Sequence, residues 1–148
     1  ERYKLISSPR AGTVNLIAGS YLDESHQHFV ISGATSKDQA TASRTVRAAF
    51  TRWQRPPRFE LYDLQKDPYE WHDQSQNPEL VEVKRRLIKA LTDQQEQTHD
   101  PFIDPKNVEA YVTEQLANRD LAYKGNKSFR WSYLDAFPKW RAAHLSEQ

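Results

Sequence analysis

The chain has no cysteine, no methionine and only four glycines in 148 residues. Without cysteine, it can contain no disulfide, no thiolate metal ligand and no cysteine nucleophile. No phosphate-binding glycine loop, no G-x-S-x-G and no H-E-x-x-H motif occurs. No apolar run approaches the roughly 20 residues of a membrane-spanning helix. The sequence therefore offers no catalytic motif of these kinds and predicts no membrane partner.

Apolar residues make up 37% of the chain, which is below the ~45–50% typical of globular domains, and the mean hydropathy is −0.90. The chain nevertheless contains 4 Trp, 7 Tyr and 6 Phe, too many for a disordered segment. A modest core, long polar loops and aromatic side chains that cover another surface would reconcile these values. Because no initiator methionine is present, we interpret the chain as a segment of a larger polypeptide.

The 21 basic residues nearly balance the 20 acidic ones, and the net charge is +1. The densest basic cluster lies on an expected helix that also carries acidic residues. The basic members are Lys84, Arg85, Arg86 and Lys89, and the acidic ones are Glu79, Glu82 and Asp93. A nucleic-acid-binding surface would lack that compensation, so we expect no nucleic-acid partner.

Short β-type runs occur at residues 3–6, 14–17, 29–31 and 59–64. In the last run, Phe59 and Leu61 share one side of the strand, while Glu60 and Tyr62 share the other. Apolar periodicity predicts a helix over residues 36–53, which the following Pro56-Pro57 pair ends. Asp67-Pro68 predicts a turn in which the aspartate binds nearby backbone amides.

The strongest local signal is a helix over residues 78–98. Asn77 is a good N-cap, Pro78 suits the first helical position and Glu79 complements the helix dipole. Asp104 and Pro105 predict another capped helix. The terminal segment 126–148 is rich in aromatic residues, which indicates docking on this domain or on a neighbour.

Two groups of side chains are candidates for substrate binding. His26 and His28 would share a face of a strand and could contact an anionic ligand. A metal site would need a third ligand that the sequence does not supply. The alternative to both is that these histidines lie in an exposed polar loop. Arg52, Trp53 and Arg55 could hold sulfate or carboxylate groups of a sugar, or could simply be solvated. We assign no catalytic and no metal-binding residue.

The His99-Asp100 pair sets an imidazole beside a carboxylate. Sequence neighbours rarely give the geometry of a catalytic pair, so interaction of His99 with the end of the helix dipole is the simpler interpretation.

The segment RFELYDLQKDPYEWHDQSQNPELVEVKRRLIKALTDQQEQTHDPF resembles the C-terminal region of type I, formylglycine-dependent sulfatases. The matching features are an "ELYDL" strand, an Asp-Pro turn at Asp67, a helix that starts near Pro78, and a Thr-x-Asp-Pro exit at residues 98–101. Residues 2–6 resemble the strand that opens the same subdomain. The exit and the spacing are most similar to the heparan N-sulfatase (sulfamidase) group and its bacterial relatives.

The resemblance implies an α+β fold, in which a small antiparallel sheet of about four strands carries the long helix across one face. It implies a subdomain over residues 1–104, followed by a helical, aromatic extension over residues 105–148. The expected partners are the N-terminal catalytic domain of the same polypeptide and a sulfated saccharide such as a glycosaminoglycan. Formylglycine and calcium belong to that catalytic domain, so we expect no cofactor here.

The motif that yields formylglycine, C/S-x-P-x-R, is absent from this chain, since Ser7-Ser8-Pro9-Arg10-Ala11 lacks its arginine. The resemblance therefore implies that this segment alone is inactive. It also suggests a periplasmic, secreted or lysosomal location. A free-standing carbohydrate-binding or protein-interaction module, without catalysis, is the alternative.

Overall fold

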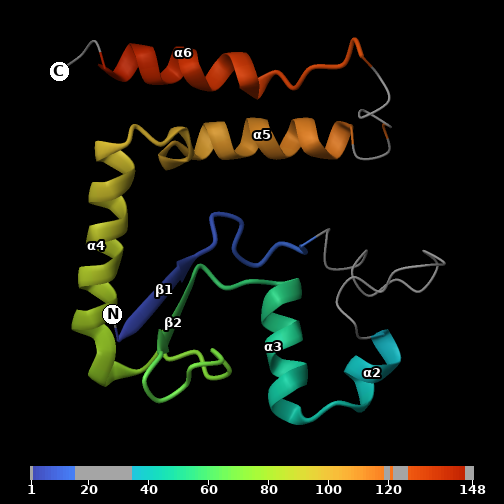
Figure 1. Cartoon of the computed structure of the whole chain (residues 1–148), viewed down its shortest axis with the longest axis vertical. Coiled ribbons are helices and arrows are strands. Elements are labelled where there is room, and N and C mark those ends of the chain that lie inside the picture. Colours follow the sequence, from blue (N-terminus) through green and yellow to red (C-terminus); the bar gives the residue numbers. More distant parts are fainter. Residues whose placement is uncertain (1, 16–34, 119–120, 122–126, 146–148) are drawn as a thin grey trace. The chain divides into compact units, whose positions relative to one another are not determined.

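The computed structural model describes residues 2–15, 35–118, 121 and 127–145. Its elements, in chain order, are β1 (Tyr3–Ser7), α2 (Ser36–Thr41), α3 (Arg44–Gln54), β2 (Phe59–Asp63), α4 (Val81–Gln97), α5 (Pro105–Ala117) and α6 (Tyr133–Leu145) (Figure 1). Two 3-10 turns, η1 (Pro78–Leu80) and η2 (Pro101–Ile103), precede α4 and α5. The described part of the chain is a mostly helical α+β fold, with five helices and one two-stranded antiparallel sheet.

The sheet forms between two of the predicted strands, those at residues 3–6 and 59–64. β1 and β2 are antiparallel, and their register places Leu5 opposite Leu61. The pairing continues past the strand ends, because the Ser8 amide donates to the Arg58 carbonyl at 2.9 Å. The chain is thus paired along the whole of β2.

The second edge of β2 is covered by the loop that follows it. The Leu61 amide donates to Asp73 Oδ1 at 2.9 Å, and the Gln74 amide donates to the Leu61 carbonyl at 2.7 Å. Asp73 thus supplies the acceptor that a third strand would otherwise provide. Leu61 is 0% exposed and Tyr62 is 3% exposed, so the small core of the sheet lies at this point of β2.

Two further strands were expected, and the structure describes neither. Val14 and Asn15 lie outside any strand, because the Asn15 amide donates to the Gln54 carbonyl at the end of α3, at 2.8 Å. Residues 16–17 and 29–31 lie outside the described residues. The described sheet therefore has two of the four expected strands.

The helix predicted over residues 36–53 is wrong in one respect, since it is two helices. α2 ends at Ala42, whose backbone is extended, and Ser43 becomes the N-cap of α3 by accepting from the Val46 amide at 3.4 Å. Serine favours a cap over a helix interior because its hydroxyl competes for backbone donors. α2 itself begins with a capping box between Thr35 and Asp38.

The long helix over residues 78–98 is confirmed, with η1 as its first turn. Asn77 Oδ1 accepts from the Glu79 amide at 3.0 Å, as its N-cap role requires. At the other end, His99 has a φ of 48°, and the Asp100 amide reaches back to the Gln95 carbonyl at 2.9 Å. Together with the bond from the His99 amide to the Glu96 carbonyl, this is a Schellman termination.

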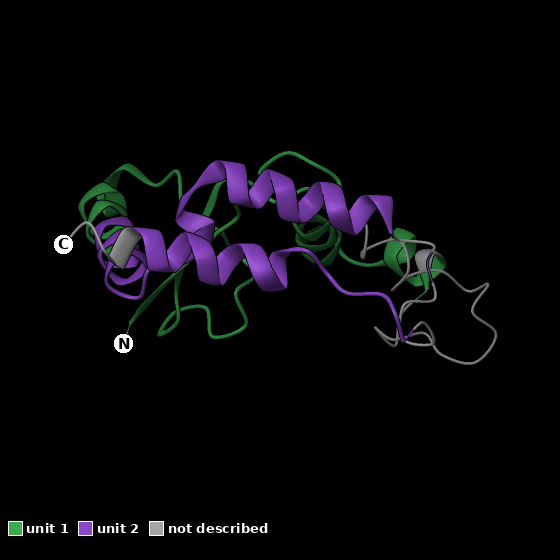
Figure 2. Cartoon of the chain, turned by 90° about the horizontal axis from the view of Figure 1, so that it is seen from above, with its two compact units in different colours: residues 1–87 green, residues 88–148 purple. Residues whose placement is uncertain are grey.

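The chain divides into two compact units, residues 1–87 and 88–148, which Figure 2 colours separately. The first unit holds the sheet, α2, α3 and the start of α4. The second holds the rest of α4 and the antiparallel pair α5 and α6, which lie side by side (Figure 1). The predicted cap at Asp104 is confirmed by its bond from the Lys106 amide at 2.9 Å. The boundary expected at residue 104 stays a prediction.

No helix within the described ranges is both long and apolar enough to cross a membrane.

Candidate functional site

The residues proposed for substrate binding are only partly within the described structure. His26 and His28 lie outside it. Arg52 and Arg55 point to different partners, since Arg52 Nη2 donates to the Trp71 carbonyl at 2.7 Å and Arg55 Nη1 donates to the Gly12 carbonyl at 3.3 Å. The two guanidinium groups are therefore engaged with the chain itself.

Arg52 belongs to a half-buried polar cluster beside β2. Its Nε lies 3.5 Å from Glu60 Oε2, and the Tyr62 hydroxyl donates a hydrogen bond to the same carboxylate. Burial raises the pKa of Tyr62, and the bond to Glu60 adds to this effect. Trp53 lies on the same helix, where its ring meets Phe50 edge-on at 6.2 Å. This arrangement joins the side chain of Arg52 on α3 to that of Glu60 on β2, and it explains why one side of the strand is polar yet covered.

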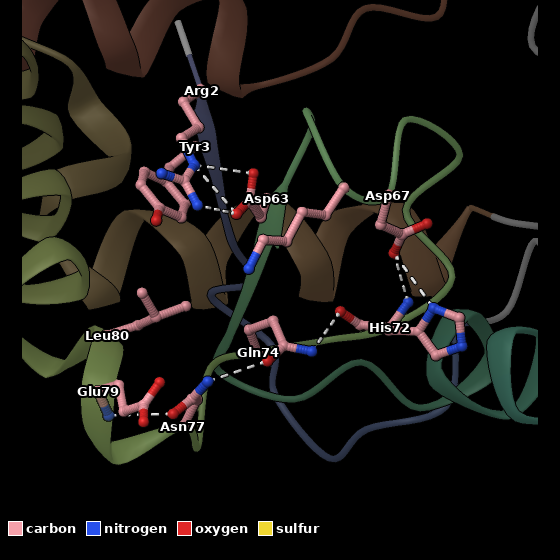
Figure 3. A pocket seen from close by; sticks show the side chains of 10 residues that line it. Arg2, Tyr3, Asp63, Asp67, His72, Gln74, Asn77, Glu79 and Leu80 are labelled. Atoms are coloured by element: carbon pink, nitrogen blue, oxygen red, sulfur yellow. Dashed lines mark hydrogen bonds and ion pairs between the residues drawn. The ribbon is translucent and has the colours of Figure 1, made fainter.

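A different part of the first unit is hollowed. A cavity of about 420 Å³ lies beside the end of β2, and Figure 3 shows the side chains around it. Arg2 and Tyr3 line it from the start of the chain and Asp63 from the end of β2. The Arg2 guanidinium donates to Asp63 through Nε, at 3.1 and 3.0 Å to the two carboxylate oxygens, and through Nη2 at 2.6 Å.

The Arg2–Asp63 pair fixes one wall of the cavity. The hydrogen bonds from Arg2 lower the pKa of the Asp63 carboxyl below its usual range. The guanidinium carbon also lies 4.8 Å from the centre of the Tyr3 ring, a cation–π distance. Asp63 is therefore a charged, nearly buried carboxylate whose partner precedes Tyr3, the residue that pairs with Asp63 in the sheet.

The loop after β2 forms a second wall, with Lys66, Asp67, His72 and Gln74 lining the cavity. Asp67 Oδ2 accepts from the His72 amide at 2.7 Å, which confirms the predicted aspartate turn. Burial alone would raise the pKa of Asp67, but hydrogen bonds from backbone amides, that of His72 first, outweigh burial and lower it. The loop is further held by Glu70, whose carboxylate accepts from Lys4 Nζ at 2.8 Å.

The start of α4 forms the third wall. Asn77, Glu79 and Leu80 line the cavity there, and Figure 3 shows Asn77 and Glu79 at the opposite end from Asp67 and His72. Asn77 Nδ2 donates to Gln74 Oε1 at 3.2 Å, so the loop and the helix start are joined by an amide pair. Sequence reasoning missed this site, because it assigned these residues to a turn and a cap.

Within the described ranges, no group of three or more histidine, aspartate or glutamate side chains could hold a metal ion.

The second unit carries an aromatic cluster, formed by Phe102, Tyr111, Phe129, Trp131, Tyr133 and Phe137. The rings meet in a chain of contacts with centroid distances from 4.8 to 6.0 Å. Phe102 is 38% exposed, and the nearby helices α5 and α6 also expose Leu116 and Leu134. The sequence left open whether the terminal aromatic residues dock on this domain or on a neighbour. In the structure they pack on residues of their own unit, and part of the cluster stays open to solvent.

Comparisons of this chain with protein-family models, with curated proteins and with solved structures found no match.

Proposed function

We propose that the chain is the C-terminal part of a formylglycine-dependent sulfatase that hydrolyses sulfate ester or N-sulfate groups of a saccharide such as a glycosaminoglycan. In this role it supports the catalytic domain and lines one wall of the substrate cleft, without a complete active site of its own. One observation carries the proposal, namely that all motifs of the resemblance but the exit at residues 98–101 coincide with elements of the first unit. They are β1, β2, the Asp67 loop and the capped start of α4.

The residues of these motifs also carry the bonds that hold those elements. Asp63 binds Arg2, from the segment that resembles the opening strand. Asp67 closes the loop after β2, and Asp100, in the "THDP" exit, caps η2 by accepting from the Phe102 amide at 2.9 Å. Each of these three aspartates makes a specific hydrogen bond that holds a local part of the fold. A sequence pattern with such structural roles supports a common fold with the sulfatase subdomain.

The finer architecture is part of the proposal. We infer a sheet of about four strands with α4 across one face, and a catalytic domain on the same polypeptide that supplies formylglycine and calcium. At the start of α4, Lys84 already reaches the sheet, because its Nζ lies 5.7 Å from the centre of the Phe59 ring and donates to the Ser75 carbonyl at 2.9 Å.

The test compares the 148-residue chain with the full polypeptide that contains it. The coding sequence upstream of residue 1 is expected to contain C/S-x-P-x-R, and the full polypeptide is expected to release sulfate from an aryl sulfate or from N-sulfoglucosamine when calcium is present. The chain alone is expected to release none. Turnover by the chain alone would refute the division of labour, and an upstream region without the motif would refute the sulfatase assignment.

The exposed aromatic cluster favours a second candidate function, a free-standing interaction module. Phe102, Leu116 and Leu134 present apolar surface, as binding surfaces do. Light scattering separates the two candidates. A module that functions alone is expected to be a monodisperse monomer, whereas a subdomain separated from its catalytic domain is expected to self-associate.

A further inference from the structure

The backbone groups of β1 alternate between two edges of the strand. The Leu64 amide donates to the Arg2 carbonyl at 2.8 Å, and the Ser8 amide donates to the Arg58 carbonyl at 2.9 Å. The even-numbered residues of this segment therefore direct their backbone amides and carbonyls at β2. In an antiparallel ladder the residues between them direct theirs the other way, so the odd-numbered residues of β1 form its outer edge.

The outer edge of β1 consists of the backbone amides and carbonyls of Tyr3, Leu5 and Ser7. Within the ranges that the structure describes, these groups make no hydrogen bond. The outer edge of β2 differs, because the loop after that strand bonds to the amide and the carbonyl of Leu61. The sheet thus has one closed edge and one open edge, and an open edge is a template for a further strand.

The open edge lacks the features that usually prevent such pairing, which are proline, a β-bulge or a free lysine. β1 contains no proline, and its register with β2 is continuous from Tyr3 to Ser7. Its one lysine, Lys4, donates through Nζ to both carboxylate oxygens of Glu70 at 2.8 Å. The charge of Lys4 is therefore engaged by the neighbouring loop.

The sequence of β1 is complementary to itself. In an antiparallel pair of two β1 strands with a two-fold axis at Leu5, that residue faces Leu5 of the second copy, Tyr3 faces Ser7, and Lys4 faces Ile6. The residues of the outer edge then face one another, and each of the three pairs exchanges two backbone hydrogen bonds. No like charges lie directly opposite, an arrangement that would destabilise the pair.

We propose that two copies of this chain associate through the outer edge of β1. The product is one antiparallel sheet of four strands in the order β2, β1, β1, β2, with the same surface used by both copies. Leu5, half-buried in the single chain, gains a leucine neighbour, and a four-stranded sheet is more stable than a two-stranded one. This interface goes beyond the proposed function and does not depend on it. The four strands inferred there come, in the dimer, from two copies.

Sedimentation equilibrium and amide hydrogen exchange test the interface in the 148-residue chain. A strand pair of this size is a small, transient interface, so the concentration is varied up to about 1 mM. The mean mass is expected to rise from monomer to dimer. The amides of Tyr3, Leu5 and Ser7 are expected to gain about tenfold in protection over the same range, whereas the amides of Lys4 and Ile6, which face β2, are expected to be protected at every concentration.

Ser7→Pro removes an N–H from the outer edge, where proline is compatible with the strand. Two of the bonds between the copies are lost by symmetry, so the Kd of the dimer is expected to rise by at least about tenfold. Ser7→Ala keeps the N–H and is the matched control, expected to associate as the parent chain does. Protection of the Ile6 amide shows whether the proline variant keeps its sheet. Tyr3→Pro, compared with Tyr3→Ala, serves if it does not.

The proposal is overturned if the chain is a monomer throughout, or if it associates while the three outer amides stay unprotected. It is also overturned if the proline and alanine variants associate alike. Protection of the outer amides in a monomer would assign the edge to another strand of the same chain, and would overturn it too. These measurements involve no sulfate release, so they are separable from the sulfatase test. Association through apolar surface is expected to persist in Ser7→Pro, which is therefore the variant in which light scattering compares the two candidate functions.

Discussion

Leu61 is the residue on which the first unit depends most directly. It is 0% exposed, it lies opposite Leu5 in the sheet, and its backbone joins β2 to the Asp73–Gln74 segment. Leu61→Ala removes the Cγ and both Cδ carbons, each worth about 0.8 kcal/mol when buried. The void left behind adds to that loss, so we expect a cost of about 3 kcal/mol, within the ~2–5 kcal/mol usual for such truncations.

Amide hydrogen exchange measures this cost where it is expected. The Leu64 amide donates to the Arg2 carbonyl at 2.8 Å, and the Ser8 amide donates to the Arg58 carbonyl at 2.9 Å, so both report opening of the sheet. A loss of about 3 kcal/mol corresponds to a decrease in protection of roughly a hundredfold. Val81→Ala, at a position that is 55% exposed, is the control and is expected to change stability by less than about 0.5 kcal/mol.

The reasoning would be refuted if Leu61→Ala lowered the protection of these amides by less than about fivefold, close to 1 kcal/mol. Leu61 would then not be the core of the unit, and the burial assigned to β2 would be wrong. Equal losses in the Leu61 and Val81 variants would also contradict it, because they would show that exposure does not decide the cost.

Three other substitutions test separate features. Asp63 has a lowered pKa in the folded chain, so its contribution to stability is complete above its unfolded pKa of about 3.9 and is lost as the pH falls through the lower folded value. Asp63→Asn is expected to be less stable at neutral pH and to lose less of its stability than the parent chain at acidic pH, as measured by urea titrations at several pH values. The control Glu96→Gln should keep the decrease in stability of the parent chain at acidic pH. Asn77→Ala removes the cap of η1 and α4 and is expected to cost about 1 kcal/mol, measured by thermal unfolding in circular dichroism, and Asn77→Asp, which keeps the acceptor, should restore most of it. The backbone of His99 lies in the left-handed region at φ 48°, where a side chain costs roughly 1 kcal/mol. His99→Gly is therefore expected to raise the melting temperature, and His99→Ala is not. A lower melting temperature for the glycine variant would contradict the left-handed conformation at this position.

The sequence predicted those elements whose signals are local. The caps at Asn77 and Asp104 each depend on a stretch of only three residues. In both, the side chain accepts a hydrogen bond from the backbone amide two positions on, so the cap forms independently of the rest of the fold. The strands around Leu5 and Leu61 were predicted by the same reasoning, because β-branched and aromatic residues between turn signals identify a strand without its partner.

What the sequence could not predict depends on contacts between distant residues. One wall of the cavity is formed by Arg2 and Asp63, which meet across the sheet, and no local pattern pairs them. Arg52 was a candidate ligand-binding residue because arginines beside a tryptophan can hold anions, but the carboxylate of Glu60 on β2 is already beside it. The break at Ser43 was hidden by apolar periodicity that continues through both helices, since a capping serine and an interior serine look alike in sequence.

The loop after β2 is closed on its own strand, because Asp73 and Gln74 return to the amide and the carbonyl of Leu61. At its tip, Tyr69 is 79% exposed. The tip can therefore accept foreign side chains, or a short inserted peptide, while the ladder beneath it stays intact. The two ends of this loop are held together by hydrogen bonds and by no covalent bridge. The loop tip is therefore a suitable place to insert an epitope or attach a fluorescent label.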